Sequence, residues 1–569
     1  MNKTLFFEHF NTLMDAPDSI GQMRKLILQL AVQGMLVPQD PNDEPASELL
    51  KRIKVEKERL VKEKKIKKEK ALPAITDNEI PYDLPKGWEW VRLGSISQIN
   101  PRNYADDDLD VSFIPMTLID DGFSNSHKSE EKKWSEIKSG FTHFQENDVV
   151  VAKITPCFQN RKSAIMKNLV NGYGAGTTEL YVFRPFGKTI LPEYLLLLFK
   201  SENFINGGVS TFTGTAGQQR VKKDFMHSVV LGVPSNEEQK RIVTKVDQLM
   251  KICDELEVKQ NKASKNRIAL NDTALNRLMS ADDEKDFSTQ WTFVRNNFDT
   301  LYTVPENVTK LRQTILQLAV QGKLVPQDPN DEPASELLKR VKVEKEKLIK
   351  EKKIKKEKSL PHISGDEMPY MLPKGWEWVR LGQLGEVCGG GTPSKKVSEY
   401  WNGSIPWVSP KDMKFDILIH SEMTISNKAI NNSSVRMIVP GSILIVARSG
   451  ILKHTLPVCI NSMECTVNQD IKVLMPHLKS INTYIQVMLK GFENLILDTL
   501  VKDGMTVQSL LYSEFFTYPF PFPPLSEQKR IVAKVDQLMQ ICDDLESRLK
   551  QSQKDSEKLL QAVLHETVG

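Results

Sequence analysis

Several features that mark common classes of protein are scarce in this sequence. Six cysteines occur among 569 residues, which is too few for a disulfide scaffold, and no CxxC pair is present to bind zinc. The closest two, Cys459 and Cys465, lie six positions apart. We interpret them as small apolar residues and predict no metal site.

Long apolar runs are also absent. The longest covers residues 195–199, directly after Tyr194, whereas a helix that crosses a bilayer needs about 20 apolar residues. Residues 1–10 include Glu8 and His9 and lack the ordered basic, apolar and small-residue regions of a signal peptide. We therefore expect a cytoplasmic protein with no membrane partner.

Catalytic loops are missing or incomplete. A DNA amino-methyltransferase holds its target amine in a [DNS]PP[YF] loop, but the only adjacent prolines stand in FPPL at 522–525. The phosphate loop GxxxxGK[ST] is matched only at residues 187–189, because Val182 replaces its first glycine. Three consecutive glycines at 389–391 begin no GxGxxG motif and indicate a turn.

A nuclease site would need paired carboxylates and a lysine beside a strand to hold magnesium. Asp121, Glu130 and Lys132 have this composition, but no apolar strand surrounds Glu130 in the sequence. His127 and His143 have no serine or cysteine at a recognisable spacing. We therefore predict a chain without catalytic residues and without a cofactor of its own.

The net charge of +4 is small, but basic residues are concentrated in two segments. Residues 51–70 and 339–358 each hold eleven basic and four acidic side chains, so the rest of the chain is net acidic. Only a thin apolar stripe interrupts each segment. Each is either a solvated helical arm or an arm that attracts phosphates or docks a partner subunit.

The strongest feature present is an internal duplication. Residues 24–94 match residues 312–382 at a constant offset of 288, with 58 identities in 71 positions. Residues 238–257 match residues 527–546 at an offset of 289, with 17 of 20 positions identical. The chain therefore consists of two tandem copies of one frame.

Two inserts of nearly equal length, residues 95–234 and 383–523, lie between the repeated blocks and show almost no similarity to each other. A repeat protein of the solenoid type would instead have a short period throughout. A shared frame with different inserts fits a molecule that presents two different recognition surfaces.

The second repeated block has the 4-3-4-3 apolar spacing of a coiled-coil seam. Each helix can exceed 40 residues, about 60 Å at 1.5 Å per residue, and so hold two domains at a fixed separation. The seam cysteines are expected to be core residues rather than reactive thiols. The seam residues are Ile242, Val246, Leu249, Cys253 and Leu256 in the first copy, and Ile531, Val535, Leu538, Cys542 and Leu545 in the second, continuing through Leu549, Leu559 and Val563.

The first repeated block predicts a helix, a turn and a second helix. Residues 24–36 and 312–324 have helical apolar spacing, and the shared VPQDPNDEPASELL supplies the turn. The expected boundaries are Gly34 and Gly322 as helix stops, Ser47 and Ser335 as caps of the second helices, and Pro17 and Pro305 in the first turns of the first helices.

Each insert follows the sequence LPKGWEWVRLG, in which alternating tryptophans indicate a strand. Residues 149–152 and 443–446 are also expected to be strands, and residues 193–204 a helix. We therefore predict an α+β fold in which two mixed α/β domains are joined by long helices.

The combination of LPKGWEWVRLG, an insert and EQKRIVTKVDQLM or EQKRIVAKVDQLM, present twice, resembles the specificity subunits of type I restriction–modification systems over nearly the whole chain. The insert motifs FIPMTLIDDG, VVVAKITPCF, GTAGQQRVKKDF and GGGTPSKKVSEYWNGSIPWVSPKDM look like target recognition domain sequences of that family. The long duplicated block before the first insert departs from the family pattern, so the role of residues 1–70 is the least constrained.

The resemblance implies a subunit without chemistry of its own, in which each target recognition domain reads one half of a bipartite double-stranded DNA target. Two methyltransferase subunits, which use S-adenosylmethionine, would methylate adenine N6, and restriction subunits would cleave unmodified DNA with ATP and magnesium. The conserved helices would form an antiparallel coiled coil with pseudo-two-fold symmetry that docks the methyltransferases. The implied regions are 1–94, an N-terminal helical region; 95–234, the first target recognition domain; 235–382, a central region with a long helix and the repeated block; 383–523, the second target recognition domain; and 524–569, a distal helix.

The residues expected to read DNA are polar and basic side chains in insert loops, since base contacts specify a sequence and phosphate contacts position the protein. In the first insert they are Lys153, Thr155, Asn160, Arg161, Lys162, Thr213, Thr215, Gln218, Gln219, Arg220, Lys222 and Lys223. In the second they are Thr392, Ser394, Lys395, Lys396, Trp407, Ser409, Lys411, Arg448, Ser449, Lys453, Lys502, Thr506 and Gln508. Two other classes stay open, a self-sufficient DNA methyltransferase or endonuclease and a coiled-coil adaptor between proteins.

Overall fold

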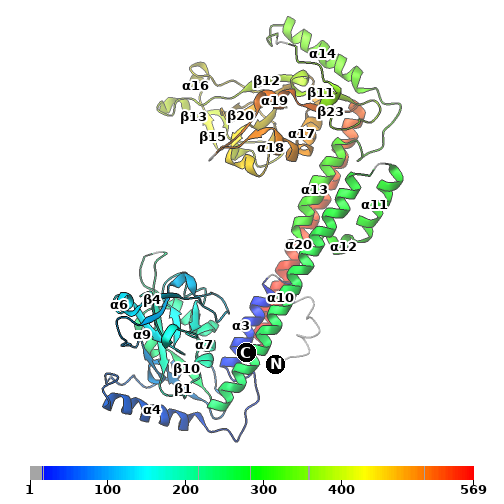
Figure 1. The fold of residues 1–569 in the computed structure, drawn as a ribbon. Coiled ribbons are helices and arrows are strands. Elements are labelled where there is room, and N and C mark those ends of the chain that lie inside the picture. The colour runs from blue at the N-terminus through cyan, green and yellow to red at the C-terminus, as the bar shows by residue number, and fades with distance from the viewer. Residues whose placement is uncertain are drawn as a thin grey trace. The chain divides into compact units, whose positions relative to one another are not determined.

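The computed structural model describes residues 14, 16, 18–68, 70–215, 217–281, 283–356, 359–504 and 507–568, with side chains up to residue 563. The chain divides into two compact units, Met1–Lys262 with Gln551–Gly569, and Ala263–Lys550. Each unit combines helices of the repeated frame with one insert (Figure 1). No helix in the described part of the chain is apolar enough over its length to span a membrane.

The frame elements recur in the same order in both units. In the first unit they are α3 (Ser19–Val32), α4 (Ala46–Lys62), β1 (Glu89–Arg92), β10 (Val230–Val233) and the start of α10 (Asn236–Met279). In the second they are α13 (Pro305–Val320), α14 (Ala334–Lys350), β11 (Glu377–Arg380), β23 (Pro519–Phe522) and the start of α20 (Leu525–Val568), with α11 (Glu284–Asn296) and α12 (Phe298–Leu301) in addition. The duplication in the sequence is therefore a duplication of structure.

Two predicted helix boundaries of the first block are confirmed and one is wrong. α3 and α13 end just before Gly34 and Gly322, whose φ angles are +71° and +72°. A Cβ on Gly34 would stand 2.5 Å from the ring of Pro85, so only glycine lets the turn before β1 pack there. Pro305 begins α13 as predicted, whereas Pro17 lies outside the described residues.

The capping role predicted for Ser47 and Ser335 is wrong. α4 and α14 begin one residue earlier, at Ala46 and Ala334, after an extended proline that makes no side-chain cap. The N–H groups of these two alanines instead donate to the oxygens of Gly87 and Gly375, at 2.9 and 2.8 Å. A tertiary contact therefore satisfies the helix start in place of a capping side chain.

The seam residues of the long helices pack into the core of their own unit. Ile242, Val246 and Cys253 are buried in the first unit, and Leu249 and Leu256 pack against the same cluster. In the second unit the buried seam residues are Ile531, Val535 and Cys542, with Leu538, Leu545 and Leu549 beside them. Towards the end of α20, Leu560 is buried with Val563 against Ala16, while the predicted Leu559 is only partly buried.

Side-chain contacts fix the directions of the packed helices within each unit. Arg24 of α3 pairs with Asp254 and Glu257 of α10, while Gln39, after α3, reaches Glu238 at the start of α10. α3 and α10 are therefore antiparallel.

The same arrangement recurs in the second unit. Arg312 of α13 pairs with Asp543 and Glu546 of α20, and Gln327 donates to Glu527. α13 runs parallel to the end of α10, because Asn307 contacts Arg267 and Lys323 contacts Met279. Within this unit α20 is thus antiparallel to α13 and to the end of α10. These pairs place the repeated charges of the frame at matching positions.

The first insert contains two four-stranded sheets, in the orders β2-β9-β6-β7 and β4-β3-β8-β5. The prediction of a strand at residues 149–152 is confirmed, and all four residues of this strand, β6, are buried. The elements are α5 (Leu93–Ile96), β2 (Ser97–Ile99), β3 (Asp110–Ile114), β4 (Glu130–Lys133), α6 (Trp134–Ile137), β5 (Thr142–Gln145), β6 (Val149–Ala152), β7 (Ser163–Ile165), β8 (Tyr173–Gly176), β9 (Leu180–Pro185), α7 (Pro192–Lys200), α8 (Glu202–Ser210) and α9 (Lys223–Ser228).

The single helix predicted for residues 193–204 is wrong, because α7 ends at Lys200 and α8 begins at Glu202. Ser201 has an extended backbone, and its hydroxyl accepts the N–H of Phe204 as the N-cap of α8. A hydroxyl cap inside an apolar run therefore divides what the spacing alone presents as one helix.

The second insert has a five-stranded sheet in the order β12-β20-β16-β18-β14 and two three-stranded sheets, β15-β13-β19 and β17-β22-β21. The predicted strand at 443–446 is confirmed as the fully buried β16. The elements are α15 (Leu381–Leu384), β12 (Gly385–Gly389), β13 (Trp401–Val408), β14 (Ile417–Leu418), β15 (Met423–Ile425), α16 (Asn427–Asn431), β16 (Ile443–Val446), β17 (Arg448–Ser449), β18 (Val458–Asn461), β19 (Thr466–Val467), β20 (Ile471–Pro476), α17 (Asn482–Gly491), α18 (Glu493–Thr499), β21 (Val501–Lys502), β22 (Gln508–Leu510) and α19 (Tyr512–Thr517).

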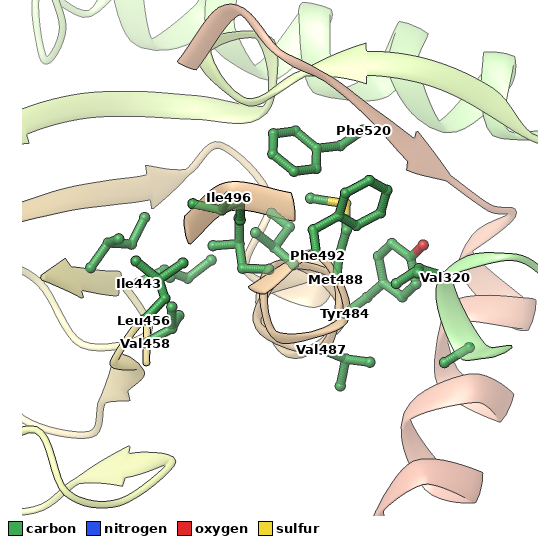
Figure 2. Packing of buried hydrophobic residues seen from close by; sticks show 14 of the residues in the cluster. Val320, Ile443, Leu456, Val458, Tyr484, Val487, Met488, Phe492, Ile496 and Phe520 are labelled. Carbon is green, nitrogen blue, oxygen red and sulfur yellow. The ribbon is translucent and has the colours of Figure 1, made fainter. Parts of the chain in front are cut away.

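One apolar cluster joins the second insert to its frame. Tyr484 and Met488 of α17 lie in the same cluster as Val320 of α13 and Phe520 of β23 (Figure 2). The hydroxyl of Tyr484 donates to the backbone oxygen of Pro521 at 3.0 Å. In the first unit the buried Tyr194 donates to Gly232 in the same way, at 2.9 Å. The inserts differ in sequence, but each packs on its frame through the same kind of buried tyrosine hydrogen bond.

Candidate nucleic-acid interface

A two-stranded ladder joins the two ends of each insert. β1 pairs antiparallel with β10, from Glu89 opposite Val233 to Arg92 opposite Val230, and β11 pairs with β23 in the same manner. Each insert thus leaves the frame and returns to it at one place. Its internal sequence can therefore change without displacing the frame helices.

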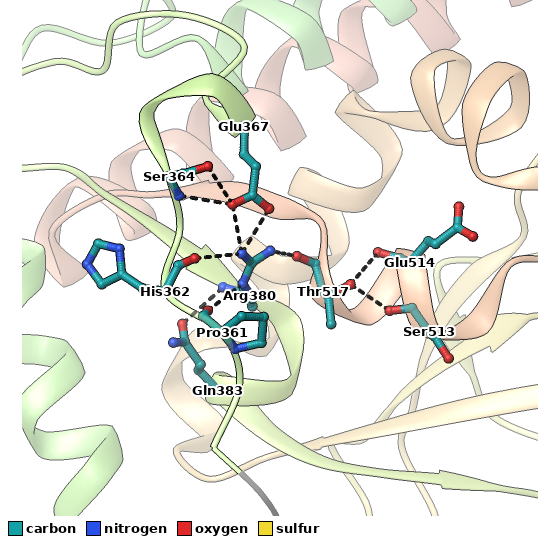
Figure 3. Close-up of polar contacts among 9 residues, drawn as sticks. All are labelled: Pro361, His362, Ser364, Glu367, Arg380, Gln383, Ser513, Glu514 and Thr517. Carbon is teal, nitrogen blue, oxygen red and sulfur yellow. Dashed lines mark hydrogen bonds and ion pairs between the residues drawn. The ribbon is translucent and has the colours of Figure 1, made fainter.

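A buried arginine fastens each ladder, and Figure 3 shows the one in the second unit. The guanidinium of Arg380, which is 2% exposed, pairs with Glu367 at 2.9 Å. It also donates to the backbone oxygens of Pro361, His362 and Thr517. Arg92 makes the matching set of bonds to Glu79, Pro73, Ala74 and Ser228. We call each set, an arginine with its glutamate and three backbone oxygens, a clasp.

The clasp carboxylates remain ionised at neutral pH. The Arg92 guanidinium, helped by the backbone N–H of Thr76, lowers the pKa of Glu79 to about 2. The backbone N–H of Ser364 and the Arg380 guanidinium lower the pKa of Glu367. Both ion pairs of the two clasps therefore persist over the ordinary range of pH.

A buried glutamate in the first turn of each long helix lies beside the turn before the ladder. Glu527, 1% exposed, accepts the indole N–H of Trp376 at 2.9 Å and the side-chain N–H of Gln327 at 3.3 Å. Glu238 accepts the corresponding Gln39 bond at 3.0 Å. Burial raises the pKa of both carboxyls. The LPKGWEW and EQKR motifs thus meet in space, which explains why they are duplicated together.

In the first insert the two polar runs predicted to read DNA lie side by side. The N–H of Val221 donates to the oxygen of Lys153 at 2.9 Å, and the N–H of Thr155 donates to the oxygen of Gln219 at 2.9 Å. The N–H of Gln219 returns to the hydroxyl of Thr155 at 3.1 Å. We call the resulting surface the first patch; its exposed predicted residues are Asn160, Thr213, Thr215, Gln218, Arg220, Lys222 and Lys223, with Lys153, Thr155 and Gln219 half-buried.

The second insert builds a comparable surface around its small sheet β17-β22-β21. Arg448 lies opposite Ser509, and Ser449 lies opposite Gln508, while Lys502 on the third strand also faces Ser509. The Arg448 side chain is 64% exposed and lies 3.6 Å from Asp470. We call this surface, Arg448, Ser449 and Lys502, the second patch, with the buried Gln508 behind it.

The two patches occupy the same place in their inserts. Each begins directly after the buried central strand, β6 or β16, and each is completed by a later polar segment. The N–H of Val221 donates to Lys153 in one insert, and the N–H of Leu510 donates to Ala447 in the other, at 2.9 and 2.8 Å. Unlike sequences therefore form one arrangement, in which donors and basic groups are presented from adjacent segments.

Other predicted residues of the second insert lie on loops outside this small sheet. Thr392 bonds to the side chain of Gln469, next to the Asp470 that Arg448 approaches. Ser394, Lys395, Lys396, Lys411 and Lys453 are exposed. Thr506 lies outside the described residues.

Several predicted DNA readers have side chains already engaged inside their insert. Arg161 bonds to the oxygen of Lys200 and pairs with Glu202. The Nζ of Lys162 donates to Met116 and Ile119. Trp407 is buried with its indole N–H on Gly391, Ser409 bonds to Asp412, and Gln508 is 9% exposed. These side chains hold the loops that carry the exposed ones.

The sequence gives no sign of the role of Lys200, which joins two loops beside the first patch. Its Nζ, almost fully buried, donates to the oxygens of Gly122 at 2.8 Å and Arg161 at 3.0 Å. Burial, together with the nearby positive charge of Arg161, lowers the pKa of Lys200 to about 7. Lys200 stands at the end of an apolar helix, where a basic residue is common, so the sequence gives no reason to single it out.

Aromatic rings beside cations are a second feature missed in the sequence. The Nζ of Lys153 lies 5.4 Å from the ring of Tyr181, and the Nζ of Lys472 lies 4.8 Å from the half-exposed ring of Tyr512. The exposed ring of Tyr512 suits contact with sugar and base surfaces, whereas the ring of Tyr181 is buried beside Lys153. Both lysines neighbour their patch, and only the tertiary structure brings the tyrosines to them.

The described residues contain no group of three or more histidine, cysteine, aspartate or glutamate side chains placed to hold a metal ion. The chemistry of both patches is that of hydrogen-bond donors, acceptors and cations. Such surfaces suit recognition of nucleic-acid backbones and base edges.

Comparison with known proteins agrees with this arrangement. The sequence model of the type I restriction modification DNA specificity domain matches residues 85–265 and again residues 373–553. Each match begins at the turn before a ladder, spans one insert and extends along a long helix.

Close relatives cover almost the whole chain. The Escherichia coli type I restriction enzyme EcoAI specificity subunit is 42% identical over 568 residues, with 96% of this chain and 93% of that protein covered. The EcoEI specificity subunit of the same species is 40% identical with the same coverage. A solved chain from work on assembly and conformational transition of the type I R-M system shares the fold, with a TM-score of 0.50 at 20% identity, covering 86% of this chain and 99% of that one. The chain therefore belongs to the family of type I restriction–modification DNA specificity subunits.

Proposed function

We propose that each insert is a target recognition domain that reads one half of a bipartite double-stranded DNA target. The chain would thereby direct adenine N6 methylation and restriction by partner subunits, without catalytic residues of its own. The observation that carries this proposal is the shared arrangement of the two patches, since inserts of unlike sequence present different side chains from the same place in the fold.

The energies of base contacts support two domains rather than one. A good bidentate contact discriminates between bases by about 1–3 kcal/mol, whereas specific binding exceeds non-specific binding by roughly 4–10 kcal/mol. One small patch supplies part of that difference. Two linked patches supply the whole.

The proposed partners are double-stranded DNA, two methyltransferase subunits that use S-adenosylmethionine, and restriction subunits that use ATP and magnesium. The modest net charge of +4 supports a chain that binds DNA weakly alone, with the methyltransferases adding phosphate contacts. The proposal places the assembly in the cytoplasm with its DNA.

Co-expression of this chain with its methyltransferase subunit, followed by methylome sequencing, tests the proposal. We expect N6-methyladenine in one bipartite motif that is absent when either protein is left out. Methylation by the chain alone would make it a self-sufficient enzyme, and the absence of any motif would favour a protein adaptor. A DNA affinity that is equal with and without the methyltransferase would contradict the shared-contact hypothesis.

A further inference from the structure

A groove of about 900 Å³ lies in the first unit, outside the patches, between α4, residues 70–75 and β1. Its floor is apolar: Ile53 and Ile96 are buried there, and Leu72, Ile75 and Trp90 are half-exposed. A half-exposed apolar floor of this kind is suited to a partner that buries it.

The rim of the groove is basic. Lys54, Lys62, Lys68 and Lys70 line it, all exposed and none with a hydrogen bond or ion pair among the described residues. Glu58 is the one acidic residue among the described residues that line the groove. Among the described lining residues, lysines therefore outnumber carboxylates and the rim is net positive.

The cations of α4 that lie outside the groove are paired in contrast. Lys51 pairs with Glu48 at 2.6 Å, Arg52 with Glu44 at 2.6 Å, and Arg59 with both Glu56 and Glu63 at 2.7 Å. The basic residues of α4 that face away from the groove are thus paired with carboxylates, whereas Lys54 and Lys62 on the groove side are not paired within the described chain. A merely solvated arm gives no reason for this division.

The second unit also contains both paired and unpaired basic residues on its lysine-rich helix. Lys339, Arg340 and Lys347 of α14 pair with Glu336, Glu332 and Glu344, while Lys342 and Lys350 are exposed and make no such bond in the described part of the chain. The matching floor residues are Val341, Leu360, Ile363, Trp378 and Leu384.

Exposed positions that the fold does not constrain have stayed alike in the two arms, although the adjacent inserts have diverged. α4 and α14 are identical at 14 of 17 positions. An identical surface carried twice on one chain fits two copies of one partner. It does not fit two different DNA half-sites.

We propose that the groove of the first unit, and the equivalent surface of α14 in the second unit, each bind an acidic amphipathic segment of one methyltransferase subunit. This inference rests on the proposed function, because it takes the methyltransferase as the partner present twice. Apolar side chains of the segment cover the floor, and its carboxylates face the unpaired lysines. Duplex DNA would satisfy the lysines but would leave the apolar floor uncovered.

Charge reversal on one or both surfaces tests the proposal on the full-length complex. The variants are K54E/K62E for the groove, K342E/K350E for the equivalent surface of α14, and the four changes combined. Native mass spectrometry is expected to count two methyltransferase copies on the unmodified chain and one on each double variant. The combined variant is expected to bind methyltransferase at least tenfold more weakly.

Two controls separate charge from folding. K128E/K188E in the first insert makes the same charge change at exposed positions outside the groove and outside the long helices and is expected to keep both copies. Replacing the same four lysines of α4 and α14 by arginine keeps the charge and should also keep both copies. Circular dichroism melting of every variant identifies any that fail to fold.

A peptide array that tiles the methyltransferase sequence identifies the bound segment. Peptides with acidic residues along one face of an amphipathic helix should bind the unmodified chain and lose binding to the combined variant. Binding confined to neutral or basic peptides would overturn the inference.

The remaining outcomes distinguish this inference from the proposed function. Two copies on the folded combined variant overturn the groove proposal while motif methylation by the unmodified chain still supports the function. A fall in affinity for a DNA duplex with unchanged methyltransferase binding assigns the groove to phosphates and also overturns it. No motif methylation by the unmodified complex overturns the proposed function itself.

Discussion

The repeated frame and the two inserts differ in what the two copies have in common. The frame keeps residue identities: both clasps, both buried glutamates and both helix pairings recur at offsets of 288 or 289 residues. The inserts keep only an arrangement, in which a polar segment bonds to the chain that leaves the central strand. Side-chain identity is therefore kept in the frame, where the two copies share their packing and their partners. In the inserts, where the two target sequences differ, only the backbone arrangement is kept.

The largest expected effect on stability comes from substitutions in the two clasps of the frame. Arg92→Met and Arg380→Met each remove a buried guanidinium and leave several backbone oxygens without donors. Each change should lower the free energy of unfolding of its own unit by about 3 kcal/mol, since unsatisfied buried groups cost roughly 1–3 kcal/mol apiece.

Urea denaturation with a fluorescence probe in each unit measures this effect. Lys339→Met, which removes only an exposed ion pair, should stay within about 0.5 kcal/mol of the unmodified chain. Equal, small effects for all three changes would show that the clasps do not hold the ladders.

The next largest effect separates the two patches. Lys153→Ala and Arg448→Ala remove the first basic side chain after β6 and β16, and each should weaken binding by about 1–3 kcal/mol, a loss of roughly 5- to 150-fold. Each loss should be confined to the half-site that its own insert reads.

Gel-shift titration of the methyltransferase complex on duplexes with one scrambled half-site assigns the effect. When the half-site read by the mutated insert is already scrambled, the substitution should add little. Lys188→Ala, outside both patches, serves as the control. A uniform loss on all duplexes would mean that the two residues contact phosphates only.

The last effect, the smallest when taken per unit of pH, concerns Lys200, which has no counterpart in the frame. Its folded pKa of about 7 lies below the ordinary lysine value near 10.4, so between these pH values the unfolded chain binds more protons. The free energy of unfolding of the first unit should therefore rise as the pH increases from 7 towards 10, by at most about 1.4 kcal/mol per pH unit.

The comparison with Lys200→Met isolates this contribution, because all other titrating groups cancel in the difference between the two proteins. The difference in unfolding free energy should change steadily over this pH range. Parallel curves would show that Lys200 stays charged in the folded protein.

Much of the frame could be predicted from the sequence, because duplication and apolar spacing act over short distances along the chain. The long helices, the stops at Gly34 and Gly322 and the strands at 149–152 and 443–446 follow from local patterns. The start of α4 could not, since the N–H of Ala46 is satisfied by Gly87 from another segment.

The candidate interface was predictable as regions rather than as residues. Polar runs indicated the loops, but whether a polar side chain faces outward depends on distant partners. Arg161 and Lys162 are equally polar in sequence to Lys222 and Lys223, yet the first two bond to neighbouring loops and the last two are exposed. Lys200 was invisible for the same reason, because its two acceptors come from separate loops.

Exchange of one insert tests the central claim most directly. Residues 95–234 would be replaced by the corresponding insert of another family member, with the frame and the second insert unchanged, and the methylome of cells that carry the complex would be sequenced. The account predicts a motif in which one half-site is new and the other is unchanged. A motif altered in both halves, or not altered at all in a folded and active complex, would contradict it.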